Sequence, residues 1–346
     1  MNKQQLNNSL TPSIYLIYFE WSNTAGNHAG MSYLASLLGR DFKEVKLIKM
    51  ISGKSKLKKA LNLLYIWYIA ISLRVKLKSG DQVFFMEYLA RSCFQDKLAH
   101  ILRILGLKNR FVGLVHLAGS HLMEIYHKES VIRKKLRFID DCVVFGSSLS
   151  SFLKEEIGFP NVIKTFHYVD TEYYHPLQDK PSNKKPRVVC LGNIKRDFNS
   201  LKGLVERMPQ VHFDICQGVL NLEAIFKEYN NVSLYGYLGE DELLYLMQKD
   251  DICLSIMYDT VGSNVITTSM ATGLVLVVSD VGSIRDYCST DMAVLCKDPK
   301  DFENALYDLS RDPEHLKEMS NKAIEKSISF SYNEFKKEFC KIFSIG

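Results

Sequence analysis

The sequence predicts an α/β protein built from two successive Rossmann-like domains, whose parallel sheets face each other across a central cleft. Two observations predict this fold class. Short apolar runs that read as strands alternate with segments of helical spacing, and this alternation stops at a polar, proline-containing stretch before it restarts. Alternating strands and helices are typical of parallel sheets that are covered on both faces. With 346 residues, the chain is long enough for two domains of ordinary size.

The first half of the chain, residues 1–170, is predicted to form the first domain. It opens with the apolar run SIYLIYF, which predicts a strand at 13–19, and a polar turn and a helix follow. The further expected strands are 44–50, 82–88, 110–116 and 141–146, and the expected helices lie near 30–39, 55–75, 90–106, 121–137 and 148–157.

Residues 171–186 are the predicted linker, because this stretch is polar and contains Pro176, Pro181 and Pro186. The second domain is predicted at 187–330 and begins with the apolar run RVVCLGN. Its further expected strands are 210–216, 232–236, 252–258, a buried run within 261–283, and 293–296, with helices near 240–250, 299–310 and 313–328. The segment 331–346 again has helical spacing.

Composition and cysteine usage favour a globular protein in a reducing compartment. Apolar residues make up 47% and charged residues 24% of the chain, which excludes a disordered protein. The eight cysteines are scattered without a CxxC pair. The first dozen residues are polar, and the longest apolar stretch, 61–73, is shorter than the ~20 residues that span a membrane as a helix. We therefore expect a cytoplasmic protein without a signal peptide or a transmembrane helix.

The segment 54–78 combines seven Lys or Arg residues at its ends with Tyr65, Trp67 and Tyr68 in its middle. This pattern resembles a helix that lies on an anionic membrane surface, which would place the protein peripherally on the inner face of the cell membrane. The alternative is a core helix with solvated ends, because 63–71 is apolar on all sides. A nucleic-acid partner is not expected, since no recognition fold accompanies the charge.

Two turns, one near the start of each domain, are candidates for binding a phosphate group. AGNHAG at 25–30 joins the first strand to the first helix, and its spacing lacks the GxGxxG dinucleotide fingerprint, which disfavours an NAD enzyme. It is either a contact for a phosphate or sugar or a plain strand-to-helix turn. GNIKRDF at 192–198 follows the first strand of the second domain. Arg196 would emerge there and either bind a diphosphate or lie in solvent.

A third turn, GSNVITTSMATG at 262–273, is the most specific of the candidates. Gly262 permits close approach of a ligand to the backbone, and Ser263 or Asn264 can cap the helix that follows. The free amides of the first helical turn also attract an anion. Because this turn and 192–198 both follow strands of one parallel sheet, they favour one shared ligand.

His116 ends the strand 110–116, where a histidine would face the cleft rather than the core. Signatures of metal ligands and nucleophiles are absent from the sequence: there is no DxD, HExxH or GxSxG motif. The adjacent pairs Asp140–Asp141 and Asp250–Asp251 both precede strands. They are therefore expected at the edge of each sheet that lies away from the cleft, so neither a metal nor a bound cofactor is predicted.

With these motifs in order, the chain resembles the GT-B glycosyltransferases, and among them most closely glycosyltransferase family four. The motifs that carry the resemblance are FHYVDTEYYHP, RVVCLGN, GNIKRDFNSL, VSLYGYLGEDELLYLMQKDDICLSI, SMATGLVLVVSDVGSIRDYC and SISFSYNEFKKEFCKIF. The resemblance implies that Arg196 stands at the place of the family's phosphate-binding lysine and Asn193 where arginine is frequent. It implies that His116 lies near the reacting sugar, and that the helix in 331–346 crosses back to the first domain.

The chain departs from this family at two glutamates that flank the glycine turn. Thr260, with Asp259 beside it, stands at the first position, and Thr268 stands at the second, where the family's carboxylate holds the nucleotide ribose. A threonine hydroxyl cannot offer a carboxylate to two hydroxyl groups, so donor geometry must differ or activity must be low. Tyr168 also replaces a glycine at the junction between the domains.

The resemblance implies metal-independent transfer of a sugar from a nucleotide-sugar donor to a glycan, with retention at the anomeric carbon. The expected acceptor is a growing cell-surface glycan, such as O-antigen or capsule, on a lipid carrier. The alternatives are a nucleotide-sugar epimerase and a non-catalytic GT-B partner subunit. The candidate catalytic residues are His116 and Arg196, and the candidate donor-binding residues are Gly26, Asn27, Gly192, Asn193, Arg196, Asp259, Thr260, Gly262, Ser263, Asn264, Val265 and Thr268.

Overall fold

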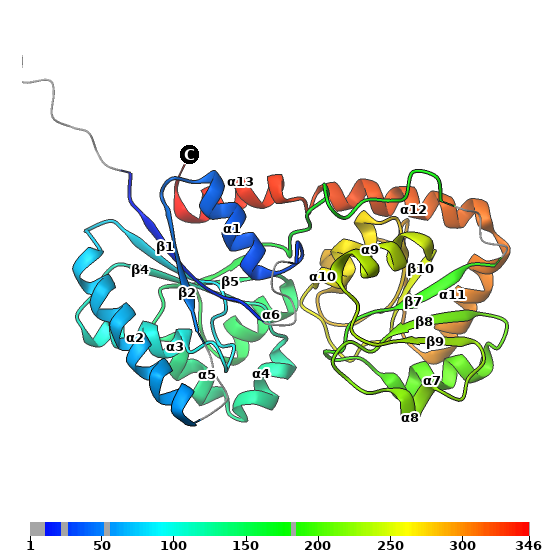
Figure 1. Cartoon of the computed structure of the whole chain (residues 1–346), viewed down its shortest axis with the longest axis horizontal. Coiled ribbons are helices and arrows are strands. Elements are labelled where there is room, and N and C mark those ends of the chain that lie inside the picture. Colours follow the sequence, from blue (N-terminus) through cyan, green and yellow to red (C-terminus); the bar gives the residue numbers. More distant parts are fainter. Residues whose placement is uncertain (1–10, 22–26, 52–55, 181–184, 346) are drawn as a thin grey trace, which may run out of the picture.

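The protein, seen here in a computed structural model, is described for residues 11–21, 27–51, 56–180 and 185–345, with the side chains of 56–60 left out. It consists of two α/β domains that lie side by side (Figure 1). Each domain contains a six-stranded sheet, and every strand pair within these sheets is parallel. The predicted fold class is therefore confirmed.

The first sheet has the strand order β2-β1-β3-β4-β5-β6. Its strands are β1 (Ile14–Phe19), β2 (Val45–Met50), β3 (Gln82–Phe85), β4 (Arg110–Val115), β5 (Asp141–Val144) and β6 (Val162–Lys164). Its helices are α1 (Met31–Asp41), α2 (Lys56–Lys76), α3 (Gln95–Ile104), α4 (Gly119–Tyr126), α5 (Glu129–Leu136) and the short α6 (Ser147–Ser151), which continues as a π-helical turn at Phe152–Glu156.

Two details of the first domain differ from the expectation. The single helix expected near 121–137 is two helices, because His127 takes a left-handed conformation that ends α4 and Lys128 is extended. The short strand β6 was not expected, since two of its three residues are only partly buried, the third is exposed, and they carry no strong strand pattern.

The second sheet has the order β12-β11-β10-β7-β8-β9. Its strands are β7 (Arg187–Cys190), β8 (His212–Cys216), β9 (Val232–Tyr235), β10 (Ile252–Ser255), β11 (Val275–Ser279) and β12 (Ala293–Cys296). Its helices are α7 (Phe198–Arg207), α8 (Glu223–Phe226), α9 (Glu240–Lys249), α10 (Asn264–Ala271), α11 (Pro299–Arg311) and α12 (Pro313–Ile328), with a 3-10 turn at Ile284–Asp286. All residues of β10 and β11 are buried, as expected for strands covered on both faces.

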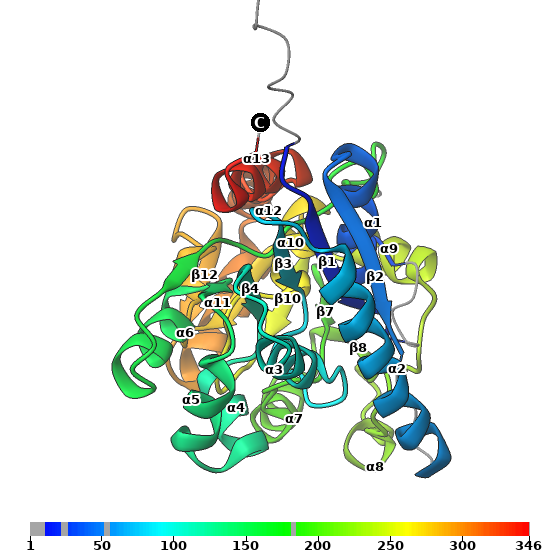
Figure 2. The same ribbon diagram turned by 90° about the vertical axis from the view of Figure 1, so that its left-hand side faces the viewer.

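The helix α13 (Tyr332–Phe343) follows α12 and lies on the first domain beside α1 (Figures 1 and 2). Its aromatic side chains Phe339 and Phe343 pack against Phe84 of β3. Arg110 Nη1 donates to the carbonyl oxygen of Ile342 at 2.6 Å, which ties the end of α13 to β4. The face of the first sheet that α1 and α13 cover is thus completed by a segment that comes after the whole second domain.

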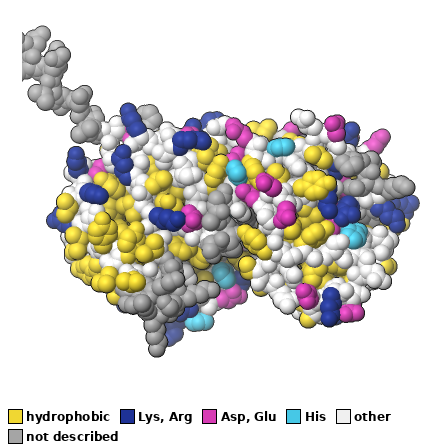
Figure 3. Space-filling model, in the orientation of Figure 1, with side chains coloured by type: hydrophobic (Ala, Val, Ile, Leu, Met, Phe, Trp, Pro, Cys, Tyr) yellow, Lys and Arg dark blue, Asp and Glu magenta, His cyan; other side chains and the backbone are white. Residues whose placement is uncertain are grey.

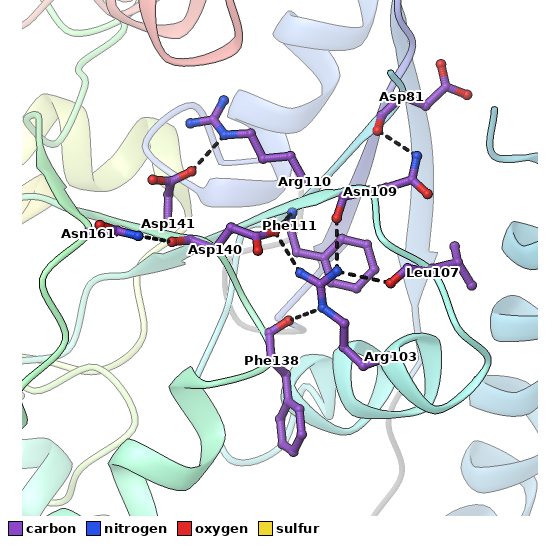
Figure 4. A network of polar contacts seen from close by, with 10 residues as sticks. All are labelled: Asp81, Arg103, Leu107, Asn109, Arg110, Phe111, Phe138, Asp140, Asp141 and Asn161. Atoms are coloured by element: carbon purple, nitrogen blue, oxygen red, sulfur yellow. Dashed lines mark hydrogen bonds and ion pairs between the residues drawn. The ribbon is translucent and has the colours of Figure 1, made fainter. Parts of the chain in front are cut away.

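Ion pairs close the amino edges of both sheets, away from the cleft. Arg103 Nη2 and the amide of Phe111 both donate to Asp140 Oδ2 at 2.7 Å, and Arg110 Nε donates to Asp141 Oδ2 at 2.7 Å (Figure 4). Asp141 is the first residue of β5, so this aspartate pair lies where the sequence placed it.

In the second sheet, Arg187 at the start of β7 pairs with Asp214 and, at 3.1 Å, with Asp250. Both carboxylates are fully buried. Burial, together with the neighbouring charge of Asp214, raises the pKa of Asp250 to about 7 even though Arg187 lowers it. These acids therefore belong to the structure of the amino edge, and function is to be sought at the carboxyl edges.

Candidate active site

A cavity of about 320 Å³ lies between the domains, at the carboxyl edges of both sheets. The first domain lines it with Trp21, Ala29, Gly30, Met31, Glu87, His116, Leu117, Ala118 and His167, and the second domain lines it with Gly192, Asn193, Ile194, Lys195, Arg196, Asp259, Thr260, Val261, Gly262, Ser263, Asn264 and Val265. The loops after β7 and β10 meet here because these two strands are neighbours at the point where the strand order reverses. The cavity thus has the position at which open α/β sheets bind ligands.

The N-terminus of α10 faces this cavity, and its polar groups are not used up by helix capping. Ser263 holds the N-cap position, but its side chain makes no capping hydrogen bond, and its buried Oγ has no partner among the described residues. Asn264 does not cap the helix in the expected way either, because its Oδ1 accepts from the next amide, Val265, at 3.0 Å. The serine hydroxyl and the dipole of the helix end are therefore left to attract an anion.

Gly262 gives the backbone the shape that this turn requires. Its φ of +86° is left-handed, and a Cβ at this position would lie 2.2 Å from the ring of Tyr287. Tyr287 is fixed in turn, because its hydroxyl accepts from the amide of His167 at 2.8 Å and donates to the carbonyl of Phe145 at 2.5 Å. Only glycine fits between this anchored ring and the cavity.

Arg196 is brought next to the same helix end. Its guanidinium donates to the carbonyl oxygens of Leu191 at 3.1 Å and Ile194 at 3.2 Å. A Cβ added to Gly192 would lie 2.9 Å from Nη2 of Arg196 and 3.3 Å from a methyl group of Val265 in the first turn of α10. The guanidinium, Gly192 and α10 therefore enclose one small space.

The charge of Arg196 has no counterion within the described parts of the chain, where no carboxylate forms an ion pair with it. Burial lowers the pKa of Arg196 below its ordinary value, yet a guanidinium stays protonated in proteins. A largely buried cation without a partner is costly, and a bound anion would remove that cost. Nearby Asn193, whose buried Oδ1 has no hydrogen-bond partner in the described part of the chain, adds one more polar group that a ligand would satisfy.

Thr268 does not lie at the cavity, where the resemblance implies that the residue at this position holds the nucleotide ribose. Its hydroxyl donates to the carbonyl of Asn264 at 2.6 Å, one turn back in α10, and only 4% of the residue is exposed. It does not line the cavity. Thr260 does line it, but the Thr260 hydroxyl is turned to the amide of Gly262 at 3.3 Å. Asp259, next to Thr260 in the chain, also lines the cavity, and its Oδ2 accepts from Ser120 of the first domain at 2.6 Å.

The turn at 25–30 is only partly described. Gly26 lies outside the described residues, and Asn27 does not line the cavity, since its carbonyl oxygen accepts from the amide of Gly30 at 2.8 Å. Ala29 and Gly30 do line it. His28 binds Glu240 of α9, with 2.9 Å between Nδ1 and Oε2, so this turn is also held against the second domain.

His116 faces the cavity, as predicted, but it is paired with Glu87, a carboxylate that belongs to none of the sequence motifs. Its Nε2 lies 2.9 Å from Oε2 of Glu87, and the indole of Trp21 donates to the other oxygen at 3.3 Å. Burial alone would lower the pKa of His116, but the charge and hydrogen bond of Glu87 together hold the pKa above its ordinary value. The signal for Glu87 was present, because it follows the β3 run at the same carboxyl edge as His116.

Two further residues of the cavity wall, His167 and Lys195, lie within the motifs quoted above but were not among the candidate site residues. Burial lowers the pKa of His167 to about 4, so this histidine is neutral at physiological pH. Lys195, which has a left-handed φ of +56°, reaches across the cleft and forms an ion pair with Glu124 of α4. The contacts Lys195–Glu124 and Asp259–Ser120 both join the domains at this cavity.

The outer surface of α2 lies apart from the cavity and is largely apolar. Ile66, Ile69 and Leu73 pack inward, whereas Tyr68 is 68% and Val75 is 81% exposed. Other exposed apolar residues on this helix are Leu61, Leu63, Leu64, Trp67 and Ile71. Figure 3 shows hydrophobic side chains gathered on the side of the first domain where Figure 1 places α2. The helix therefore has an inner core face and a separate apolar outer face. Within the described residues, we find no helix with the length and apolarity needed to cross a membrane.

Comparisons with known proteins show what the chain is similar to. Residues 185–312 match the family described as glycosyl transferases group 1. No curated protein sequence matches the chain. The fold is similar to that of sucrose-phosphate synthase from Thermosynechococcus elongatus, with a TM-score of 0.75 and 14% identity over 96% of this chain and 99% of that chain.

Two further solved structures are similar over nearly their whole length. HepE from Anabaena in complex with UDP has a TM-score of 0.68 and 13% identity over 96% of this chain and 99% of that chain. The lipopolysaccharide outer core galactosyltransferase WaaB has a TM-score of 0.67 and 15% identity over the same shares. These likenesses confirm the predicted GT-B fold. The family match confirms the predicted resemblance and, at the level of that family, the predicted class of enzyme, a glycosyltransferase.

Proposed function

We propose that this chain transfers a sugar from a nucleotide-sugar donor to a glycan acceptor, with retention at the anomeric carbon and without a bound metal. The observation that carries the proposal is the largely buried guanidinium of Arg196, which has no carboxylate partner among the described residues, beside the open N-terminus of α10. These groups suit the diphosphate of a nucleotide-sugar, because guanidinium forks and free helix amides both bind phosphate oxygens. HepE, which shares the fold, was solved with UDP and with UDP-glucose.

The same groups would stabilise the leaving group. Transfer breaks the bond between the anomeric carbon and the diphosphate oxygen and forms a bond to the acceptor oxygen, whose proton leaves to the diphosphate or to water. Negative charge grows on the diphosphate as the first bond breaks. A fixed cation and a helix end that face this oxygen lower the barrier, since they need no reorganisation when the charge appears. Arg196 would thus take the part that a metal ion takes in other transferases. Within the described residues, no cluster of three or more His, Cys, Asp or Glu side chains could hold a metal ion.

We further propose that the acceptor is a lipid-linked glycan of a cell-surface polysaccharide, and that α2 rests on the anionic face of the membrane. The exposed apolar row on α2 supports this, because single exposed apolar residues are common but a continuous row is not. Basic residues follow at the end of the same helix, where Arg74, Lys76 and Lys78 are exposed. Lys54 lies outside the described residues.

A binding screen followed by an activity assay tests this function. Thermal shift with UDP, GDP, ADP and their sugar conjugates should identify one nucleotide that stabilises the protein. Release of that nucleotide from the matching donor, with and without acceptor glycans and in the presence of EDTA, then measures transfer. We expect activity to be unchanged in EDTA. Binding of no nucleotide would overturn the proposal, and a donor sugar converted to its epimer without transfer would identify an epimerase instead.

One observation favours a second candidate, a non-catalytic GT-B partner subunit. The position of the family's second glutamate is filled by Thr268, whose hydroxyl is bound to its own helix and buried. A protein that binds the nucleotide in the screen but releases no sugar from any donor would favour this candidate.

A further inference from the structure

A buried carboxylate at the end of β3 organises the first-domain wall of the cleft. Glu87 is 2% exposed, and each of its oxygens accepts one hydrogen bond, from His116 Nε2 at 2.9 Å and from Trp21 Nε1 at 3.3 Å. The backbone of Glu87 is also held, because its amide donates to Gln95 Oε1 at 2.8 Å. Gln95 is buried as well and donates to the carbonyl oxygen of Ile17 in β1 at 3.2 Å. The carboxylate therefore has little freedom to move.

This arrangement constrains the charge of His116. A carboxylate removed from water is stable only when a cation compensates it, and an indole carries no charge. Among the described residues, the imidazole is the one side-chain partner of Glu87 that can become a cation. Nearby on the same side, His167 shares contact with the ring of Phe145 but is neutral, since burial lowers its pKa to about 4.

The other charged groups near His116 are already paired or lie across the cavity. Lys195 and Asp259 belong to the second domain and bind Glu124 and Ser120 of α4. Arg196 lies on the far wall, next to α10. On α4 itself, His121 Nδ1 lies 3.0 Å from Glu124 Oε2, which gives a second histidine–carboxylate pair that is far more exposed.

We propose that Glu87 is a positioning residue, which keeps the His116 imidazole protonated and in one orientation and fixes the Trp21 indole beside it. One carboxylate thereby fixes the orientation of two side chains that face the substrate cavity. The pairing is a property of the protein alone. Its use rests on the proposed function, in which the charged imidazole meets the transferred sugar opposite the diphosphate site, and the flat indole offers a surface to a sugar ring.

Titration of the histidine rings by NMR tests the pairing without any substrate. In the wild-type protein at pH 6, we expect protons on both ring nitrogens of His116 and a neutral ring for His167. In E87Q, the titration midpoint of His116 should move to lower pH by about 1 to 3 pH units, the usual effect of one adjacent opposite charge. H116N identifies the signals. A neutral His116 at pH 6 in the wild-type protein would overturn the proposal even if E87Q does not fold.

The matched control is E124Q, which removes the carboxylate from the other histidine pair. It should leave the midpoint of His116 in place. The indole is followed separately in a W67F background, because the chain has two tryptophans and Trp67 lies on α2. There, E87Q should change the emission of Trp21, whereas E124Q should not. An unmoved midpoint of His116 in folded E87Q would refute the role of Glu87.

A kinetic measurement connects the pairing to the reaction. In E87Q, the alkaline limb of the pH profile of kcat/KM should move to lower pH by the same amount as the midpoint of His116. A uniform loss of kcat/KM at every pH would mean that Glu87 only supports the fold. Failure to find any donor would remove the proposed function, but it would leave the NMR result on the pairing standing.

Discussion

Gly262 and Gly106 have nearly the same left-handed backbone and very different surroundings. At Gly106, with φ +80°, an added Cβ meets nothing within 4 Å, whereas at Gly262 it would overlap the ring of Tyr287. We expect G106A to lower the free energy of unfolding by about 1–2 kcal/mol, the cost of the backbone conformation alone. G262A should cost roughly 1–3 kcal/mol more, because the tyrosine ring must also shift. Urea denaturation of both variants measures the difference, and equal losses would mean that the ring moves freely.

Arg196 is the residue on which nucleotide binding should depend most. R196A should weaken binding of the nucleoside diphosphate by roughly 1.5–3 kcal/mol, the scale of a hydrogen bond to a charged group. Folding should be largely unaffected, since the variant removes a buried charge for which the described residues supply no counterion. Isothermal titration calorimetry gives the affinity. The control is R207A, which removes an arginine of the same domain that pairs with Glu303 on the surface. Equal affinities for R196A and the wild-type protein would exclude Arg196 from the site.

At this scale the sequence predicts backbone features better than side-chain partners. The turn at Gly262 and the place of Arg196 follow from their positions after strands of one sheet. The direction of Thr268 does not follow, because a threonine in a helix can turn its hydroxyl to the preceding turn or away from it. The bond between Glu87 and His116 joins the ends of β3 and β4, so it becomes visible only once these strands are paired.

The outer face of α2 is the element on which membrane binding should depend. Leu64, Tyr68, Ile71 and Val75 follow one another at helical spacing and are all exposed. Replacing these four residues with Gln should release the protein from anionic vesicles, because each buried apolar side chain contributes about 1.5–3 kcal/mol at most. Co-sedimentation with and without anionic lipid is the measurement.

The control for this prediction is I328Q on α12, which removes an exposed apolar residue from the second domain. It should leave vesicle binding unchanged. A wild-type protein that stays in the supernatant with both kinds of lipid would rule out the membrane proposal and point to a soluble acceptor.

The sequence predicted α2 to within one residue at each end, and it left open whether the helix belongs to a membrane surface or to the core. The structure fits the core alternative on one face of the helix, where Ile66, Ile69 and Leu73 are buried. The opposite face is exposed, as the membrane alternative requires. When a helical stretch is apolar on all sides, its sequence does not show which face of the helix will pack against the sheet. The hydrophobic periodicity that normally answers this question is missing here.

The start of β10 should make stability depend on pH. The pKa of Asp250 is raised to about 7 in the folded protein, above its ordinary value of 3.8. The folded state therefore keeps a proton that the unfolded state loses, and the stabilisation that this proton provides disappears as pH rises from about 4 to about 7. We expect D250N to lose this dependence. Across this range, the free energy of unfolding of the wild-type protein should therefore fall relative to that of D250N.

The comparison variant for D250N is D41N, which should show the opposite trend. Hydrogen bonds from Arg40 and Lys336 lower the pKa of Asp41 to about 2. The contribution of Asp41 is therefore present above pH 4 and is lost as pH falls towards 2. Denaturation curves between pH 2 and 8 compare both variants with the wild-type protein. Parallel curves for D250N and the wild-type protein would show that Asp250 is ionised throughout.

On the scale of the whole molecule, α13 should be required for the first domain to fold. Phe335, Phe339 and Phe343 are buried with the core residues of β1, β3 and α1. Deleting 332–346 should lower the free energy of unfolding of the first domain by roughly 5 kcal/mol or more, because three large side chains leave the core together. Urea denaturation followed by the binding of a hydrophobic dye measures this loss.

The control is K336A, which removes the exposed ion pair with Asp41 and the contact of Lys336 with the Tyr332 ring but leaves the three phenylalanines in place. Surface pairs of this kind contribute roughly 0–1 kcal/mol, so the variant should resemble the wild-type protein. A deletion variant as stable as K336A would mean that α13 is an accessory to the first domain and not part of its core.

The two-domain plan is the part of the structure that the sequence predicts most completely. The alternation of strands and helices, interrupted by the prolines of 171–186, is a local property of the chain, so it can be read without knowing any contact. The contacts that join the domains cannot be read in this way. Tyr287, for example, binds backbone groups of His167 and Phe145, which lie more than a hundred positions earlier in the chain.

The position of α13 in the chain has a consequence for how the protein is made. A ribosome synthesises β1 to β6 first and α13 only after the second domain is finished, so one face of the first sheet emerges without its cover. At a synthesis rate of ~5–20 residues per second, the gap between residue 170 and the last turn of α13 lasts roughly 10 to 35 seconds. During this time, the apolar side chains of β1 and β3 that α13 will cover are open to other nascent chains. The second domain can fold in order of synthesis, whereas the first must wait, and the protein should depend on chaperones that hold an unfinished sheet.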